Sequence, residues 1–155
     1  MSNHEIILQK YSEAISGLSE DCFSEVSSKW YDYVINLPFT LRITYLIVVF
    51  HSQVINGGFH QYFVSGYGQF AKETIDALIE IGAVETSKLV YAALTLVNKD
   101  NNSGVDFRKK LLTGDIQQLF VGDELFGPLD ELDRQYYRNE NEDIEYLLGS
   151  YLCRS

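Results

Sequence analysis

Acidic side chains are the most abundant functional groups in this sequence, and they gather toward its C-terminal end. Residues 123–155 carry nine Asp and Glu against three Lys and Arg, whereas residues 1–122 carry thirteen against nine. The nine acids are candidate partner-binding residues: Asp123, Glu124, Asp130, Glu131, Asp133, Glu140, Glu142, Asp143 and Glu145. Carboxylates one helical turn apart are separated by about 5.4 Å along the axis, comparable with the roughly 3.4 Å rise per phosphate of a DNA strand. Such an array would suit a basic, DNA-reading protein surface.

A second interpretation treats the same acids as a solvated surface. Acids in the first turn of a helix stabilise its dipole by roughly 0.3–1 kcal/mol, and Asp130 and Arg134 have the i,i+4 spacing of a surface ion pair. Dipole complementation needs one or two acids per helix, so nine exceed what it explains. A basic patch at Arg108, Lys109 and Lys110 could also neutralise an acidic face across a dimer. Both interpretations stay open.

Arrangements that would support catalysis or metal binding are not assembled in the sequence. None of the three histidines has a partner at the H-x-x-x-H spacing of a metal site; they are His4, His51 and His60. The acids nearest the glycine-rich centre are Asp32, Glu73 and Glu80, and their helical settings are typical of solvent-facing positions, not of a paired acid and base. We therefore expect no catalytic residue, no metal and no cofactor.

Bulk composition limits the classes of function. The net charge of −10 argues against direct nucleic-acid binding, which needs a basic stripe. No window approaches the roughly 20 apolar residues of a membrane-spanning helix, and residues 1–10 lack the basic flank and apolar stretch of a secretory signal. Cys22 and Cys153 have no C-x-x-C partner and are expected to be reduced thiols. These features predict a cytoplasmic protein.

Apolar residues recur at three-and-four spacing along the chain, which predicts an all-α fold. Two N-terminal helices are indicated by Ile7, Tyr11, Ala14, Ile15 and Leu18, and by Phe23, Val26, Trp30, Tyr33, Val34 and Leu37. A third helix is expected to begin at Pro38, since proline suits a first helical position, and to run toward Asn56. The apolar, β-branched run 43–50 is also typical of a buried strand, but a helix is favoured there.

Glycines divide the rest of the pattern. Asn56, Gly57 and Gly58 predict a break, because glycine adopts the positive φ that ends a helix. Helical spacing recurs at residues 70–79, 89–97, 107–112, 125–136 and 144–151. Since no long linker or internal repeat divides the chain, residues 1–155 are expected to form a single compact multi-helix domain. Helices within 3–36 would pack on the remainder, which ends in an acidic helical region.

Residues 56–63 read N-G-G-F-H-Q-Y-F and resemble the N-G-G-F-x-Q-Y-F signature of the bacterial DNA-mimic protein family, whose domain was long of unknown function. The matching residues are Asn56, Gly57, Gly58, Phe59, Gln61, Tyr62 and Phe63. The resemblance continues to an L-D-x-x-Y-Y element at 132–137 and covers about 37–155. Two positions depart from the family's pattern: Gln53 stands where an acid is often found, and Ser65 stands where an Asn often follows.

The motif has a structural interpretation. Its glycines would turn the chain tightly, while Phe59, Tyr62 and Phe63 pack as an aromatic plug. Gln61 would bond free backbone groups, and His60 would be a hydrogen-bonded packing residue. We therefore interpret the motif as a signature of the fold and not as an active site.

The resemblance implies a helical homodimer whose acidic surface occupies the DNA-binding face of a transcription regulator. The leading hypothesis is a non-enzymatic module that binds a basic protein through residues 123–145 and binds neither nucleic acid nor membrane. One alternative is an immunity or antitoxin-type inhibitor of a toxic enzyme, which predicts a toxin gene beside this one. Another is an enzyme with a cleft near His60, Tyr62 and Gln61, which predicts a deep polar pocket with perturbed ionisable groups.

Overall fold

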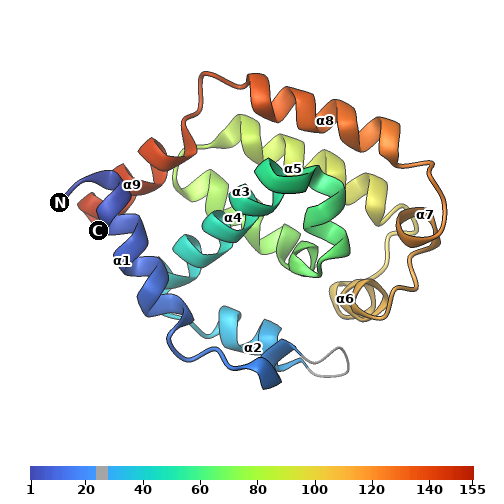
Figure 1. Ribbon diagram of the computed structural model, residues 1–155, viewed down its shortest axis with the longest axis horizontal. Coiled ribbons are helices and arrows are strands. Elements are labelled where there is room, and N and C mark those ends of the chain that lie inside the picture. Colours follow the sequence, from blue (N-terminus) through green and yellow to red (C-terminus); the bar gives the residue numbers. More distant parts are fainter. Residues whose placement is uncertain (24–27) are drawn as a thin grey trace.

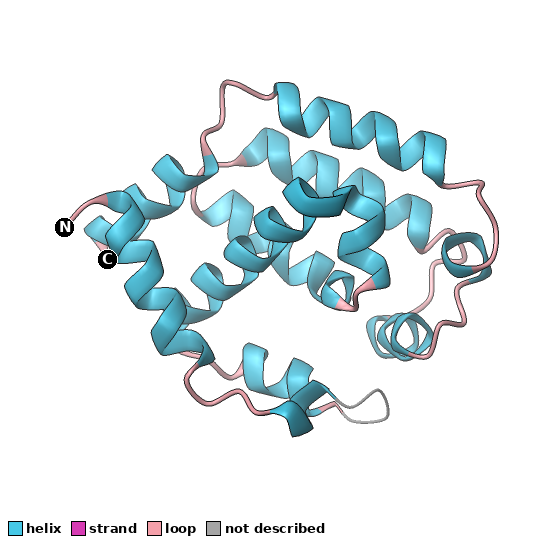
Figure 2. Ribbon diagram, viewed as in Figure 1, coloured by secondary structure: helices cyan, strands magenta, loops and turns pink. Residues whose placement is uncertain are grey.

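The computed structural model describes residues 1–23 and 28–155, and in these residues the chain forms helices joined by loops (Figure 2). The predicted all-α class is confirmed. For residues 43–50 the favoured helix is confirmed and the alternative strand is excluded, because they lie inside the long helix α3 (Phe39–Val64). That run is buried on most sides, so it lacks the polar face by which an amphipathic helix is recognised. No helix in the two described ranges has the length and apolarity to cross a membrane.

The chain begins with α1 (Asn3–Ile15), which closes against the last helix, α9 (Ile144–Arg154). A capping box starts α1, since Ser2 Oγ accepts the Glu5 N–H and the Glu5 carboxylate accepts the Ser2 N–H. A Cβ on Gly149 of α9 would lie 2.3 Å from the Cβ of Asn3. The missing side chain therefore lets the two helices approach closely, and the two termini lie side by side (Figure 1).

The second predicted helix is shorter than its apolar pattern indicated. A 3-10 turn, η1 (Glu20–Phe23), comes first, and α2 (Lys29–Ile35) begins only at Lys29; Val26 lies outside the described residues. Phe23 is not on the face of α2 but contacts Trp30 edge-on, with ring centroids 5.0 Å apart. Phe23 therefore has a sequence spacing typical of a helix face, although it lies in η1 and packs on α2 from outside that helix.

Helix α3 runs through the centre of the molecule and carries a kink (Figure 1). Gly57 and Gly58 have non-helical backbone angles, and Gly58 has φ 77° and ψ −177°. The predicted break is confirmed at this place. The helix does not end there, however, because it resumes at Phe59 and continues to Val64.

The remaining elements surround α3, and all but the short helix α7, which was not predicted, fall where helical spacing or a glycine-rich turn was expected. They are η2 (Tyr67–Phe70), α4 (Ala71–Glu80), α5 (Val84–Val97), α6 (Gly104–Leu112), α7 (Gln117–Phe120) and α8 (Phe126–Arg138). Helices α4 and α5 pack on each other, and α8 packs on both α3 and α5. Figure 1 shows α6 and α7 at the end of the molecule opposite α1 and α9.

Aromatic side chains fill the core where η2 and both halves of α3 meet. Phe59, Tyr62 and Phe63 are fully buried, which agrees with the predicted aromatic plug. The buried polar groups are satisfied within it: the Trp30 indole N–H donates to the Tyr45 hydroxyl at 2.9 Å. In the described part of the chain, no buried side-chain nitrogen or oxygen lacks a hydrogen-bond partner.

Candidate functional site

Apart from Asp133, the acids of α8 and of the loop before it are exposed, and most of them are paired with cations. Arg134 lies between Asp130 and Glu131, with Nη1 2.8 Å from Asp130 Oδ2 and Nη2 2.6 Å from Glu131 Oε2. The predicted i,i+4 pair is therefore confirmed. Glu124 forms an ion pair with Lys99 at 3.7 Å. Because Arg134 interrupts the carboxylates, α8 alone does not present an unbroken row of negative charge.

Asp133, on the same helix, points toward α3 instead of into water. Its Oδ1 accepts the backbone N–H of Phe59 at 2.7 Å, and a Cβ on Gly58 would lie 2.3 Å from its Oδ2. Burial raises the pKa of Asp133, while the hydrogen bond from Phe59 opposes this shift. The carboxylate of Asp133 serves the fold, and we leave it out of the proposed binding surface.

Glu142 is similarly engaged, because its carboxylate caps the N-terminus of α5. Its two oxygens accept the N–H of Glu85 at 2.8 Å, the N–H of Thr86 at 2.7 Å and the hydroxyl of Thr86 at 2.6 Å, and Asn139 donates a further bond at 3.2 Å. Ala83, the N-cap residue of α5, offers no side-chain cap. Burial by itself would raise the pKa of Glu142, but the hydrogen bonds from Thr86, Glu85 and Asn139 lower it overall.

The last acids of the set differ in their surroundings. Asp143 is the N-cap of α9 and accepts the Tyr146 N–H at 3.0 Å. Glu145 lies 3.6 Å from His4 Nδ1. Asp123 and Glu140 are exposed, and neither forms an ion pair with any residue in the described ranges.

Seven of the nine predicted acids thus remain on the surface, and we call them the C-terminal acidic surface: Asp123, Glu124, Asp130, Glu131, Glu140, Asp143 and Glu145. Asp123 and Glu124 precede α8, Asp130 and Glu131 lie on it, and Glu140 follows it, whereas Asp143 and Glu145 lie at the start of α9. The negative charge is therefore distributed over α8, the loops on either side of it and the first turn of α9, and it is interrupted where Asp133 and Glu142 turn inward and where Arg134 intervenes.

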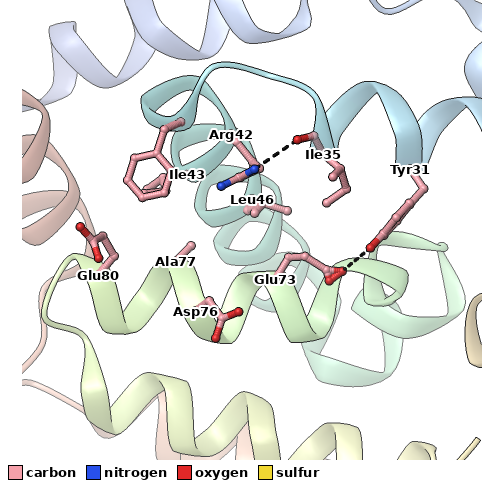
Figure 3. A pocket seen from close by; sticks show the side chains of 10 residues that line it. Tyr31, Ile35, Arg42, Ile43, Leu46, Glu73, Asp76, Ala77 and Glu80 are labelled. Carbon is pink, nitrogen blue, oxygen red and sulfur yellow. Dashed lines mark hydrogen bonds between the residues drawn. The ribbon is translucent and has the colours of Figure 1, made fainter. Parts of the chain in front are cut away.

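A second acidic feature lines a groove between α4 and the segment from α2 to the start of α3 (Figure 3). Glu73, Asp76 and Glu80 follow one another on α4 at i, i+3 and i+7, a spacing that places side chains on one helical face. Asp32 and Glu80 are exposed, as predicted. The prediction that Glu73 faces solvent is wrong: it is half-buried, and burial raises its pKa against a hydrogen bond from Tyr31. The helical spacing of the three α4 acids can be seen in the sequence, but the residues of α2 and α3 that face them cannot.

The polar residues of the 56–63 motif bond one another. Gln61 Nε2 donates to Gln53 Oε1 at 3.0 Å, and Asn56 Nδ2 donates to Gln61 Oε1 at 3.4 Å. The prediction that Gln61 bonds free backbone groups is therefore wrong, since Asp133 takes that role at Phe59. Ser65 Oγ also donates to Gln53 Oε1, at 3.1 Å. Gln53 and Ser65, at which the sequence was expected to depart from the motif's usual pattern, thus lie in direct contact.

The surroundings of His60 bear on the enzyme alternative. His60 Nε2 lies 3.2 Å from the carbonyl oxygen of Leu119, and its ring meets Phe126 edge-on at 4.9 Å. A hollow of about 440 Å³ beside it is lined by His60, Phe126, Gly127, Leu129, Asp130 and Asp133. Tyr62 and Gln61 do not line this hollow, because Tyr62 is fully buried with its hydroxyl 3.2 Å from Thr74 Oγ1. The hollow therefore contains one of the three residues on which that alternative was based.

No metal-binding cluster is formed by the side chains in residues 1–23 and 28–155, since no three of their His, Cys, Asp or Glu residues converge. The three histidines lie in separate places: His4 near Glu145, His51 beside Tyr136, and His60 against Phe126. Both cysteines are free thiols.

Comparison with protein families places these features in context. The model of the DMP19-like protein family matches residues 35–155, which include the kink of α3, the α4 groove residues and every acid of the C-terminal acidic surface. Comparisons with curated proteins and with solved structures gave no match.

Proposed function

Since the chain belongs to the DMP19-like protein family, we propose that it acts without catalysis as an acidic protein that covers the DNA-binding face of a basic partner. In this proposal the protein is a cytoplasmic homodimer and a DNA mimic. The supporting observation is the net charge of −10, together with seven acids that remain exposed on α8, in the loops on either side of it and at the start of α9. A transcription regulator is the kind of partner that this surface would fit.

The mechanism is electrostatic competition. A negative surface accelerates the encounter with a basic face, and its occupancy then excludes DNA from the same face. Surface ion pairs within one chain contribute little to its stability. Asp130 and Glu131 can therefore interact with a basic partner although each is also paired with Arg134. Charges on the surface are screened within about 8 Å at physiological ionic strength, and capture should therefore weaken steeply with added salt.

A pull-down from the native host at low salt tests the proposal, using a variant neutralised only at acids with no structural hydrogen bond. The substitutions are Asp123→Asn, Glu124→Gln, Glu140→Gln and Glu145→Gln. A control with the same change of charge alters exposed acids elsewhere: Glu13→Gln, Glu20→Gln, Asp21→Asn and Asp100→Asn. The first variant should lose a basic, DNA-binding partner that the control retains. Equal capture by both variants would clear the C-terminal acidic surface of the role, and capture of a toxic enzyme would favour the inhibitor alternative.

A further inference from the structure

The groove of Figure 3 has two walls of different chemistry. On α4 stand the carboxylates of Glu73, Asp76 and Glu80, which at 1.5 Å per residue span about 10 Å along the axis. The facing wall, from α2 and the start of α3, is mainly apolar and includes Ile35, Phe39 and Ile43. Phe39 leaves half of its surface in water, and the enclosed volume is about 460 Å³. The groove thus offers negative charge and apolar surface on opposite sides.

The α4 carboxylates are not neutralised by cations in the described part of the chain. None of the three forms an ion pair with a described Lys or Arg, and the side-chain hydrogen bonds to them come from tyrosines: Tyr31 bonds Glu73 at 3.2 Å and Tyr151 bonds Glu80 at 3.3 Å. Asp76 is exposed and accepts no bond from a described side chain. This wall therefore carries three charges that remain available to an incoming cation.

Among the described residues that line the groove, Arg42 is the one cation, and the fold holds it on the apolar wall. Its Nη1 donates to the carbonyl oxygen of Ile35 at 3.1 Å, and its guanidinium lies 5.4 Å from the centre of the Phe39 ring. Arg108 lies over the ring of Tyr31 at 3.8 Å and lowers the pKa of Glu73, but burial is the larger effect and raises it. The groove keeps a net negative charge, with its single positive group confined to one side.

We propose that this groove receives a basic, amphipathic segment of a partner protein. Lys or Arg side chains at helical spacing would pair with Glu73, Asp76 and Glu80, and apolar side chains of the same segment would cover the exposed ring of Phe39. Charge complementarity and the exposed apolar wall support this occupant together. The surface lies on other elements than the C-terminal acidic surface, so it goes beyond the proposed function and does not depend on DNA mimicry.

A linear polyamine is a different class of ligand that could also meet three carboxylates. Arg42 disfavours it, because a polycation lying along the groove would face a fixed positive charge. A peptide segment avoids this conflict, since it can present a carbonyl or carboxylate oxygen to Arg42 and branched apolar side chains to Phe39. The volume suffices for several side chains, and a small molecule would leave Asp76 and Glu80 largely in water.

The probe for this proposal is a short synthetic helical peptide with Lys on one face and Leu on the other. A second peptide of the same composition, reordered so that no amphipathic face forms, serves as its control. Binding to the full chain is followed by fluorescence anisotropy, and the site is mapped by NMR shifts of backbone amides. We expect shifts of amide signals in α2, α4 and the first turn of α3. The reordered peptide should bind with an affinity at least about tenfold lower.

Matched variants assign the contact. The pair Asp76→Asn with Glu80→Gln should weaken binding on the order of tenfold, and Phe39→Ala should weaken it similarly. The pair Asp123→Asn with Glu140→Gln changes the charge equally on the C-terminal acidic surface and should leave binding unchanged. All five residues are exposed, and circular dichroism checks that each variant stays folded.

Three results would overturn the inference: no binding of the amphipathic peptide, equal loss in both charge variants, or displacement of the peptide by spermidine at comparable concentration. The outcome is separable from that of the proposed function. If capture of the native partner does not depend on the C-terminal acidic surface while the peptide still binds the groove, only the proposed function fails. If capture of the native partner depends on the C-terminal acidic surface while the peptide does not bind the groove, only the groove proposal fails.

Discussion

The carboxylate of Asp133 in α8 accepts the backbone N–H of Phe59 in α3 at 2.7 Å, across 74 residues of sequence. The kink at Gly57 and Gly58 interrupts the helical hydrogen bonds and gives the second half of α3 a helix N-terminus of its own. Such a terminus needs an acceptor, and α8 supplies it. The carboxylate also occupies the space that a side chain at Gly58 would need. The glycine and the acid therefore depend on each other.

Gly58→Ala should be among the most destabilising single substitutions in the chain. The backbone of Gly58, with φ 77° and ψ −177°, lies in a region that is essentially restricted to glycine and costs about 1–3 kcal/mol for other residues. The new Cβ would also lie 2.3 Å from Asp133 Oδ2. We expect the free energy of unfolding in urea to fall by about 2–4 kcal/mol. Gly127→Ala is the control, since no atom lies near its Cβ position; a comparable loss in both variants would contradict this account.

Asp133 should tolerate Asn but not Ala. Asn keeps an oxygen that can accept the Phe59 N–H, and burial already disfavours the charged form of Asp133 by raising its pKa, so neutralisation costs little. Ala would leave a buried N–H without an acceptor, at about 1–3 kcal/mol. Urea unfolding of the two variants measures the difference. Gly58→Ala should also cost less in an Asp133→Ala background, because the clash is then removed while the backbone strain stays.

The helices and the kink could be predicted from sequence because they rest on local signals. The spacing of apolar residues indicates α8 and α9, and two adjacent glycines indicate the break in α3. The roles of Asp133 and Glu142 could not be predicted, because their partners lie 74 and 56 residues away. A carboxylate that caps a distant helix and one that faces water look alike in a sequence. Counting acids therefore overestimated the exposed negative charge near α8.

For the groove on α4, the sequence reveals the charged wall but not the apolar wall that faces it. The i, i+3 and i+7 spacing of Glu73, Asp76 and Glu80 could be read directly from the sequence, and it predicts one charged face. What gives that face its chemistry is the wall opposite, where Phe39 and Arg42 are set by the start of α3. Such a relation between elements becomes visible only in the folded chain.

Glu142 should stabilise the fold in a pH-dependent way. Hydrogen bonds at the N-terminus of α5 lower its pKa in the folded state below the ordinary value of 4.5. Its contribution is therefore present above that ordinary value and is lost as pH falls through the lower, folded-state pKa. Glu142→Ala should reduce the free energy of unfolding by about 1–2 kcal/mol at neutral pH and by less in acid. The exposed neighbour substitution Glu140→Ala should change neither value, and equal effects of both would argue against the cap.

His51 should make the fold less stable as pH falls below neutrality. Burial lowers its pKa from the ordinary 6.5, although Asp143 and Glu145 act in the opposite direction. Burial also raises the pKa of Tyr136, and the hydroxyl of Tyr136 is hydrogen-bonded to His51 Nδ1. Because the unfolded chain binds the proton more readily, stability is lost as pH falls below about 6.5 and through the lower, folded-state pKa. An NMR titration should give His51 a pKa below 6.5, and His51→Gln should flatten the stability profile in this range. A His51 pKa at or above 6.5 would contradict the prediction.

Arg134→Gln should strengthen capture of a basic partner, which makes it a gain-of-function test of the C-terminal acidic surface. Arg134 is bonded to both Asp130 and Glu131, so its removal frees two carboxylates in the middle of α8. Exposed pairs of this kind are worth only about 0–1 kcal/mol, and the stability of the fold should change little.

The control is Lys88→Gln, which removes one positive charge from a pair with Glu85 on α5, outside the C-terminal acidic surface. A larger gain in affinity for Arg134→Gln at low salt, shrinking at high salt, is expected because the freed charges act locally. Equal gains would mean that only the total charge of the protein matters, and no gain would remove α8 from the binding surface.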